Sequence, residues 1–375
     1  MNTSKARLPY AYGLDIVRFM CALMVSVFHL TWRNVDTAMY SPFGWVGVQV
    51  IFVISGAVIA NSAAAATPYE FVKGRFMRLH PTAWIAALVS GAVLLLVPRS
   101  AYQALGIGVI PLLGAFVRSL SLLGDYALAS SYWTLPIELS FYGLVLVSLL
   151  VGGAERLRTV ARLLVVISVP YVALLSSTLL QGSDASSLDL GYGLKNMLLL
   201  RHGLYFAIGI YVWMVTSQRT LKSLDYILLW LAIGFSGLEI LCRALQIQDN
   251  YASRTMTAMS LAVCGFLLFL ALLGVIHASL RYQAIWAPGA RAKNWIRTAG
   301  LVTYPFYLIH EVVGGAALHY ATSAGINRGT SVAIAIVIVG LVAYLIARHA
   351  EPVLRRRMER FAHLARVRAA GLKRA

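Results

Sequence analysis

The chain has 375 residues, of which 59% are hydrophobic and only 12% carry a charge. A soluble globular protein has about 25% charged residues, so this composition excludes a soluble enzyme as well as a disordered or fibrous chain. The 32 basic residues outnumber the 14 acidic ones and give a formal net charge of +18. On a membrane protein such an excess indicates cytoplasmic loops, and we expect no binding to nucleic acid.

Ten apolar stretches have the length of a membrane-spanning helix, which needs about 20 mostly apolar residues. We therefore predict an all-α polytopic membrane protein with about ten transmembrane helices in the lipid bilayer. The sequence does not specify an oligomeric state. The predicted spans are 14–33, 43–61, 79–98, 133–152, 160–180, 197–216, 225–242, 256–277, 300–322 and 331–347.

A weaker apolar stretch over 104–123 contains three glycines, a proline and Arg118. If this stretch does not cross the bilayer, the basic residues gather in the loops on the side of the N-terminus, as the positive-inside rule requires. If it crossed, every later loop would invert and the basic C-terminal tail would lie outside. We therefore predict a re-entrant or surface-lying segment at 104–123, with both termini cytoplasmic.

On this plan the chain divides into a membrane domain over 1–347 and a basic tail over 348–375. The tail is expected to lie on the anionic inner leaflet and to anchor the topology. The first helix is expected to be a membrane anchor and not a removable signal peptide, because it contains charged residues and no small-residue cleavage site follows it.

The first predicted helix carries Arg18 near its inner end and His29 near its outer end. Eleven residues at 100° per residue return to within about 20° of the same face and rise about 16 Å, so both side chains lie on one polar stripe. Asp15 precedes Arg18 by one turn and is expected to pair with it. A simpler interpretation is that Arg18 and His29 each extend to the nearest headgroups.

The second predicted helix, with the sequence GWVGVQVIFVISG, combines small residues with one amide side chain. Its glycines and Ser55 are typical of close helix packing. Gln49 is predicted to be buried, where its amide requires a hydrogen-bond partner.

The sequence FVKGRFMRLHP leads into the third predicted helix and places Arg75 and Arg78 one turn apart at the inner face. The positive-inside rule accounts for these arginines by itself. A ligand with phosphate groups accounts for them equally well, because guanidinium groups suit phosphate oxygens.

The fourth predicted helix begins SYWTLPIELSFYGL and carries Glu138 a little inside a segment that enters from the outer side. The depth of Glu138 is therefore close to that of His29, and a buried carboxylate must pair with a base or stay neutral. Tyr142 follows one turn later on the same face. Trp133 is most simply explained as an aromatic residue of the membrane interface.

The ninth predicted helix begins TYPFYLIHEVVGG, in which Tyr304, Tyr307 and His310 recur every three residues. His310 and Glu311 fall near mid-membrane, where two consecutive ionisable groups rarely serve packing alone. Glu239 is expected to extend to the nearby headgroups. The histidines expected to be peripheral and without chemistry are His80, His202, His277, His319, His349 and His363.

Several motifs of soluble enzymes are absent from the sequence. It has no Walker-type phosphate loop, no dinucleotide glycine fingerprint, no paired-cysteine zinc spacing, no HExxH and no GxSxG elbow. NTPases, dehydrogenases and the common metalloproteases are therefore disfavoured, and no metal is expected.

Taken together, the sequence resembles the acyltransferase-3 family of integral membrane acyltransferases over residues 12–348. The resemblance rests on five pieces: LDIVRFMCALMVSVFHL, GVQVIFVISG, FVKGRFMRLHP, YWTLPIELSFY and YPFYLIH. The spacing of Arg18 and His29 is similar to the family's signature on its first helix. Each piece alone is a weak signal, but five in the right order are a strong one.

The resemblance implies an O-acyltransferase that moves an acyl group, commonly acetyl, from cytoplasmic acyl-CoA to a hydroxyl of a carbohydrate such as exopolysaccharide or O-antigen. The location implied is a bacterial cytoplasmic (inner) membrane. His29 matches the family's catalytic histidine, Arg18 the arginine paired with it, and His310 the histidine that closes the tyrosine stretch. Gln49 stands where many members carry Asp, so it can orient a charged partner only as a neutral group.

The resemblance also matches Arg75 and Arg78 to a basic pair, and Glu138 to the glutamate of the fourth helix. Together with the chemistry of these side chains, it predicts that Arg75, Arg78 and Arg18 hold the CoA phosphates. His29 then acts as a general base that Glu138 orients or charge-compensates, or His29 carries the acyl group itself.

Further residues are expected to complete the site around these groups. The acceptor is expected to bind in a cleft built by the outer loops 34–42, 99–132 and 181–196. The residues expected to contact substrate or to support the site are Asp15, Gln49, Ser55, Trp133, Tyr142, Tyr304, Tyr307 and His310.

Two other classes compete with an acyltransferase. A transporter or flippase of a sugar or small metabolite would use the same buried charges as a proton relay. The sequence has no inverted repeat and its arginines gather at one face instead of the midplane, which disfavours that class. A non-catalytic scaffold leaves Arg18, His29 and Glu138 inside the bilayer without explanation.

Overall fold

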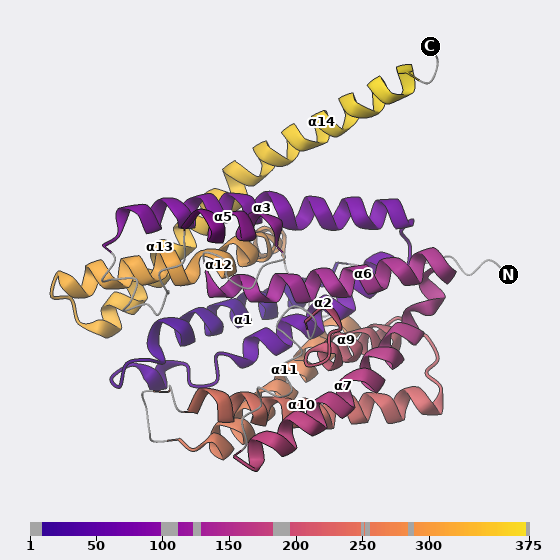
Figure 1. Ribbon diagram of the computed structural model, residues 1–375, viewed down its shortest axis with the longest axis horizontal. Coiled ribbons are helices and arrows are strands. Elements are labelled where there is room, and N and C mark those ends of the chain that lie inside the picture. Colours follow the sequence, from indigo (N-terminus) through magenta and orange to yellow (C-terminus); the bar gives the residue numbers. More distant parts are fainter. Residues whose placement is uncertain are drawn as a thin grey trace.

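All the regular structure is helical in the residues that the computed structural model describes, which are 10–98, 112–122, 129–182, 196–248, 251, 256–283 and 289–372. Figure 1 shows the long helices packed into one bundle, from which α14 projects. The helices are α1 (Tyr12–Thr31), α2 (Val46–Ala63), α3 (Pro68–Leu96), α5 (Leu112–Ser121), α6 (Thr134–Gly152), α7 (Leu157–Leu180), α9 (Gly203–Thr216), α10 (Ser223–Gln248), α11 (Ala258–Arg281), α12 (Ala290–Ser323), α13 (Arg328–Leu345) and α14 (Glu351–Leu372). Shorter turns are the 3₁₀ segments η1 (Ala38–Tyr40), η2 (Ser130–Trp133) and η3 (Gly153–Arg156), and the π-turn η5 (Ile346–Ala350).

By length and composition, eight helical runs are long and apolar enough to cross a membrane. One of these runs, Ser130–Leu180, contains both α6 and α7, and α9 is a shorter apolar helix. Each of the predicted spans therefore corresponds to a helix of the structure. The prediction of an all-α polytopic membrane protein is confirmed.

Helix α3 begins at Pro68 and not at 79, as hydropathy alone predicted. Thr67 and Glu70 form a capping box, in which the Thr67 hydroxyl accepts from the Glu70 N–H and the Glu70 carboxylate accepts from the Thr67 N–H. Proline is well tolerated directly after such a cap, because the first helical N–H groups have no partner within the helix. Arg75 and Arg78 therefore lie on the helix itself and not in a loop before it.

The weak stretch at 104–123 is described over 112–122, where it forms α5. This ten-residue helix rises only about 15 Å, which is about half of the hydrocarbon thickness. It packs against α3. The described part therefore fits a segment that does not cross, while the loop residues 99–111, 123–128 and 183–195, expected to help form the acceptor cleft, lie outside the described residues.

Helices α1 and α12 pack against each other and run in the same direction. Near their first turns, a Cβ at Gly300 would lie only 2.6 Å from the Asp15 carboxyl carbon, so this approach requires glycine. Farther along both helices, the His29 and His310 rings face each other. The polar stripe predicted on α1 is thus covered by α12 along most of its length.

Helices α2 and α9 approach still more closely. A Cβ at Gly56 would lie 2.4 Å from the Phe206 carbonyl oxygen, and one at Gly209 would lie 2.1 Å from the carbonyl oxygen of Val53. The glycines of the second predicted helix therefore serve close packing, as their small size indicated.

Glu239 is completely buried, so the prediction that it extends to the headgroups is wrong. The Arg201 Nε donates to Glu239 Oε1 at 2.6 Å, and the Tyr205 hydroxyl donates to Oε2 at 2.6 Å. The side-chain amide of Gln49 lies 3.5 Å from the same Oε2. The Gln49 amide nitrogen finds its expected buried partners in the carbonyl oxygens of Trp45 at 2.8 Å and Val46 at 3.2 Å. The Glu239 cluster joins α10 to the start of α9 beside it.

His202 is buried, so the prediction that it is peripheral is wrong, and Trp133 is partly buried and packs against it. That Trp133 lies at the membrane interface stays a prediction. The two ring centroids are 5.4 Å apart, and Phe52 of α2 lies 6.3 Å from Trp133 and 5.5 Å from His202. The reason is that η2 ends the outer loop with a tight turn, which brings Trp133 against α2 and the start of α9.

Candidate active site

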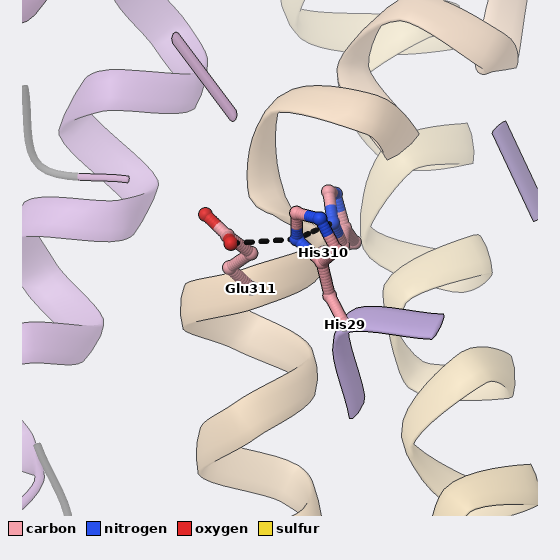
Figure 2. Close-up of side chains that lie close together, drawn as sticks. All are labelled: His29, His310 and Glu311. Atoms are coloured by element: carbon pink, nitrogen blue, oxygen red, sulfur yellow. Dashed lines mark hydrogen bonds and ion pairs between the residues drawn. The ribbon is translucent and has the colours of Figure 1, made fainter. Parts of the chain in front are cut away.

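His29, His310 and Glu311 form a compact cluster between α1 and α12 (Figure 2). The His29 Nδ1 lies 2.7 Å from Glu311 Oε1 and 3.3 Å from the Nε2 of His310. His310 is completely buried, whereas the side chains of His29 and Glu311 keep 22% and 18% of their surface exposed. The cluster is therefore anchored on its His310 side and accessible on its His29 side.

The hydrogen bonds indicate which nitrogen of His29 carries the proton. His310 Nδ1 lies 2.7 Å from the Tyr307 carbonyl oxygen, which can only accept, so this nitrogen of His310 is a donor. In neutral His310 the Nε2 is then an acceptor, and so is Glu311 Oε1. His29 Nδ1 between them must donate, which leaves His29 Nε2 with a free lone pair.

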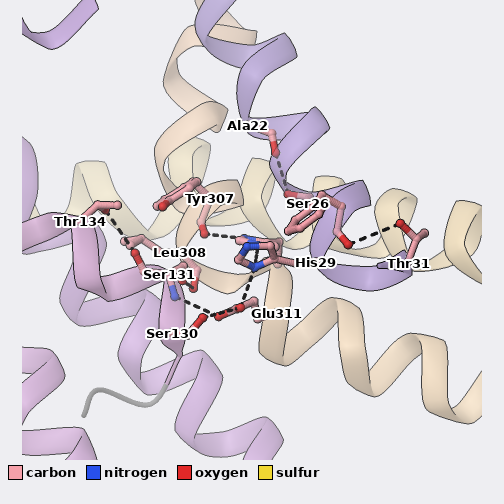
Figure 3. Close-up of polar contacts among 12 residues, drawn as sticks. Ala22, Ser26, His29, Thr31, Ser130, Ser131, Thr134, Tyr307, Leu308 and Glu311 are labelled. Atoms are coloured by element: carbon pink, nitrogen blue, oxygen red, sulfur yellow. Dashed lines mark hydrogen bonds and ion pairs between the residues drawn. The ribbon is translucent and has the colours of Figure 1, made fainter. Parts of the chain in front are cut away.

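Glu311 is held in place by the turn η2 (Figure 3). The Ser130 hydroxyl donates to Glu311 Oε1 at 2.6 Å, and the Ser131 backbone N–H donates to Oε2 at 2.9 Å. The Ser131 hydroxyl in turn donates to the Leu308 carbonyl of α12 at 3.2 Å. These bonds fix the carboxylate toward His29 and favour its charged form.

Glu138 does not contact His29, so the prediction that Glu138 orients this histidine is wrong. The carboxylate on His29 is Glu311. The turn η2, which precedes α6, already occupies the level of the cluster. Glu138 consequently lies deeper along α6, where it accepts a hydrogen bond from the Tyr142 hydroxyl.

Glu138 instead lines a narrow cavity of about 70 Å³ together with Arg18, Arg75 and Arg78. The Arg75 guanidinium lies 5.9 Å from the ring centre of Tyr142, and its buried Nε has no hydrogen-bond partner in the described part of the chain. Three arginines against one carboxylate give this cavity an excess of positive charge. Its lining thus suits an anionic ligand.

The narrow cavity extends from the arginines toward the His29 cluster. Arg18 pairs with Asp15 at 3.6 Å, as predicted, and lies at one end. Tyr307 also lines the cavity, and its carbonyl oxygen binds His310. Since Tyr307 borders both, the cavity and the histidine cluster are neighbours along α12.

The comparison with known families agrees with these features. A family model of an acyltransferase domain matches residues 11–348 of the chain. The chain belongs to the acyltransferase-3 family. It is therefore an integral, multi-pass membrane acyltransferase. Neither a curated protein nor a solved structure matches the chain.

In this acyltransferase the remaining predicted site residues divide into two groups. Ser55 and Tyr304 line the narrow cavity beside the arginines. Gln49 and Trp133 lie apart from it, in the packing between α2 and the start of α9. Gln49 faces the Glu239 carboxylate, where an aspartate would place two negative charges together.

Glu311 has the sequence signature of an ionisable group near mid-membrane but no predicted role, and nothing in the sequence indicates Ser130 and Ser131. The signal for Glu311 was its position directly after His310 inside an apolar helix. The two serines carried no such signal, because their contribution depends on the contact between η2 and α12.

Among the described residues, one group of side chains places three potential metal ligands close together, namely His29, His310 and Glu311. The ligand atoms of His29, His310 and Glu311 all lie within 4.8 Å of one another. Hydrogen bonds among these groups account for this spacing without an ion. That no metal takes part stays a prediction.

Proposed function

We propose that this acyltransferase moves an acetyl group from cytoplasmic acetyl-CoA to a hydroxyl of a carbohydrate, such as exopolysaccharide or O-antigen, at a bacterial inner membrane. One observation carries the proposal. A histidine bound to a carboxylate joins α1 and α12, and the same two helices contribute Arg18 and Tyr307 to the wall of an arginine-lined cavity. Such a pairing provides both a base for a hydroxyl and a binding place for an anionic donor.

The dimensions of the donor support this arrangement. Arg18 and His29 are separated by a rise of about 16 Å along α1. A pantetheine arm has a backbone comparable to four or five residues of extended chain, or about 16 Å. With its phosphates at Arg18, Arg75 and Arg78, acetyl-CoA therefore reaches the neighbourhood of His29 with its thioester.

In the proposed reaction His29 acts as a general base. Its Nε2 takes the proton of the acceptor hydroxyl while the hydroxyl oxygen attacks the thioester carbonyl carbon. Glu311 stabilises the imidazolium that forms, because it is held as a carboxylate by Ser130 and Ser131. Collapse of the tetrahedral intermediate breaks the carbon–sulfur bond, and the CoA thiolate takes the proton back from His29.

A variant of this mechanism places the acyl group on His29 itself. The His29 Nε2 attacks the thioester carbonyl carbon and the carbon–sulfur bond breaks, which releases the CoA thiolate. The acceptor hydroxyl then attacks the acyl-imidazolium, the carbon–nitrogen bond breaks to free His29 Nε2, and the hydroxyl proton passes to solvent, where it balances the thiolate. If His29 carries the acyl group, the protein becomes labelled when radioactive acetyl-CoA is supplied without acceptor. General-base catalysis requires that no label remains on the protein under these conditions.

The first experiment is binding of acetyl-CoA to the purified protein in detergent, because it needs no knowledge of the acceptor. We expect clear binding by the wild type and a dissociation constant at least about tenfold higher in Arg75→Ala/Arg78→Ala, since a hydrogen bond to a charged group contributes about 1.5–3 kcal/mol. Lys73→Ala is the matched control, because Lys73 is an exposed cation on the same helix that lines neither cavity described for this protein.

Failure of the folded wild type to bind any acyl-CoA would contradict the proposal. A proton-coupled transporter or flippase would then be the function to test, by uptake into vesicles.

A further inference from the structure

A second and wider cavity, of about 400 Å³, lies at the predicted cytoplasmic ends of the helices. It shares the wall residues Arg18, Val58, Arg78 and Tyr304 with the narrow cavity, so the two cavities adjoin each other. Its wall also includes Arg297 of α12 and Arg355 of α14. The tail helix, predicted only to anchor the topology, thus contributes its first turns to a cavity of the membrane domain.

The wall of the wide cavity has more positive than negative charge. Asp15 is already engaged, because it pairs with Arg18 and accepts a hydrogen bond from the Tyr10 hydroxyl. Burial and this bond to Asp15 raise the pKa of Tyr10, so its phenol keeps its proton. The charged residues of the wall are Arg18, Arg78, Arg297 and Arg355, with Asp15 and Glu351 opposing them.

Arg297 is exposed and rests on aromatic rings. Its guanidinium carbon lies 5.1 Å from the ring centre of Tyr10 and 5.8 Å from that of Tyr12. It forms no ion pair with any residue in the described ranges, and neither does Arg78. Contact with ring faces holds a guanidinium in position while its N–H groups stay available at the edge.

Arg355 of α14 lines the same cavity. Its only described ion pair is a surface contact with Glu359 at 3.3 Å, in which half of each side chain is exposed. Such a pair contributes little and is easily exchanged for a better anion. The base of α14 packs against α3, and η5 packs against α3 and α12, so the position of Arg355 relative to Arg78 is held by the bundle.

The two adjoining cavities match the two parts of a CoA donor. The pantetheine arm is uncharged and slender, whereas the nucleotide end is bulky and carries a diphosphate and a separate 3′-phosphate. Arg18 and Arg78, at the junction of the two cavities, suit the diphosphate. Arg297 and Arg355 are the cations that remain in the wide cavity.

We propose that Arg297 and Arg355 bind the 3′-phosphate of the donor, which makes the first turns of α14 part of the donor site. The inference rests on the proposed function, because it assumes an acyl-CoA in the narrow cavity. It gives the tail helix a role in distinguishing CoA from dephospho-CoA, which lacks only that phosphate. Beyond these first turns α14 projects from the bundle (Figure 1).

The test compares the binding of CoA and dephospho-CoA to the full-length protein, purified in a detergent free of anionic lipid. The wild type is expected to bind CoA at least about tenfold more tightly, as charge-assisted hydrogen bonds require. In Arg297→Ala/Arg355→Ala this preference falls to about onefold, while the affinity for dephospho-CoA stays unchanged and shows that the variant is folded. Arg356→Ala, an exposed arginine on the same helix outside the cavity, keeps the preference.

Four results would overturn the inference. An undiminished preference for CoA in the double variant removes these arginines from the 3′-phosphate, and an equal loss of affinity for both ligands assigns them to another part of the donor. If added phosphatidylglycerol abolishes the preference for CoA in the wild type and has no effect on the double variant, the two arginines bind lipid headgroups instead. If the wild type binds neither ligand, the proposed function fails as well.

Discussion

Two buried clusters of charged residues lie in the same bundle, and they differ in what they leave unbonded. In the first, Glu239 is fully buried and both of its oxygens are bonded, to Arg201 and to Tyr205. In the second, Glu311 and His310 hold His29 from one side, and no described residue bonds the His29 Nε2. Both clusters cost desolvation energy, but only the second presents a reactive atom.

The difference shows that intramembrane charge alone does not identify a catalytic site. The Glu239 carboxylate, with both oxygens bonded, joins α10 to the start of α9 and makes the packing specific, whereas a carboxylate-bound histidine with one free nitrogen can carry out proton transfer. Accessibility and an unused lone pair separate the two clusters. The following variants test that separation.

The largest effect is expected for His29→Ala. The transfer rate should fall by about 10²–10⁴-fold, because the alanine removes the Nε2 that takes the proton of the acceptor hydroxyl. The measurement is transfer of radioactive acetyl to acceptor by membranes with equal amounts of protein. His319→Ala is the control, because His319 lies on α12, the helix of His310 and Glu311, but outside the cluster. Transfer at the wild-type rate in His29→Ala would remove this histidine from the mechanism.

Glu239→Ala should act on stability and not on chemistry. The free energy of unfolding is expected to fall by about 3–5 kcal/mol, since Arg201 would stay buried without its carboxylate. Thermal unfolding in detergent measures the change, with Glu155→Ala as the control, because the Glu155 side chain is 89% exposed. Activity per folded molecule should stay close to wild type. A stable but inactive Glu239→Ala would show that both clusters serve catalysis.

Glu311→Gln should act on chemistry at nearly constant donor affinity. We expect kcat to fall by about 10²-fold, because glutamine keeps the size of the side chain but cannot stabilise the imidazolium. Steady-state kinetics with varied acetyl-CoA separate kcat from KM. Glu138→Gln is the comparison: it should change mainly KM, because Glu138 lines the arginine cavity. If Glu138→Gln instead lowered kcat and Glu311→Gln changed mainly KM, Glu138 and not Glu311 would be the carboxylate that assists His29.

The smallest effect is expected for Gly300→Ala, which tests the packing of α1 on α12 that supports the cluster. The added Cβ would lie 2.6 Å from the Asp15 carboxyl carbon, and the forced shift should cost about 1–3 kcal/mol of stability. Gly340→Ala is the matched control, because nothing lies within 4 Å of its Cβ and alanine favours the helix. Equal melting temperatures of the two variants would show that α1 and α12 leave room for a Cβ at position 300.

Much of the fold follows from local properties of the chain. Apolar stretches of sufficient length identify the spans, because a helix in lipid must satisfy its backbone groups internally. Helical geometry alone places Arg18 and His29 on one stripe and pairs Arg18 with Asp15, as the structure has it. The start of α3 could also be predicted from the sequence, since Thr67 and Glu70 have the spacing of a capping box. Hydropathy missed it because it detects the apolar span and not the end of the helix.

The sequence by itself thus determined the fold class, the family and the histidine at the centre of the candidate site. Only the tertiary structure decided which carboxylate serves that histidine. Glu138 and Glu311 both lie within apolar helices, and depth along a helix follows from position in the chain. The neighbour that a side chain meets depends on how each helix is rotated and shifted against the next, and these contacts arise from packing across hundreds of residues. For that reason Glu311 lies on His29, Glu239 on Arg201, and Glu138 among the arginines.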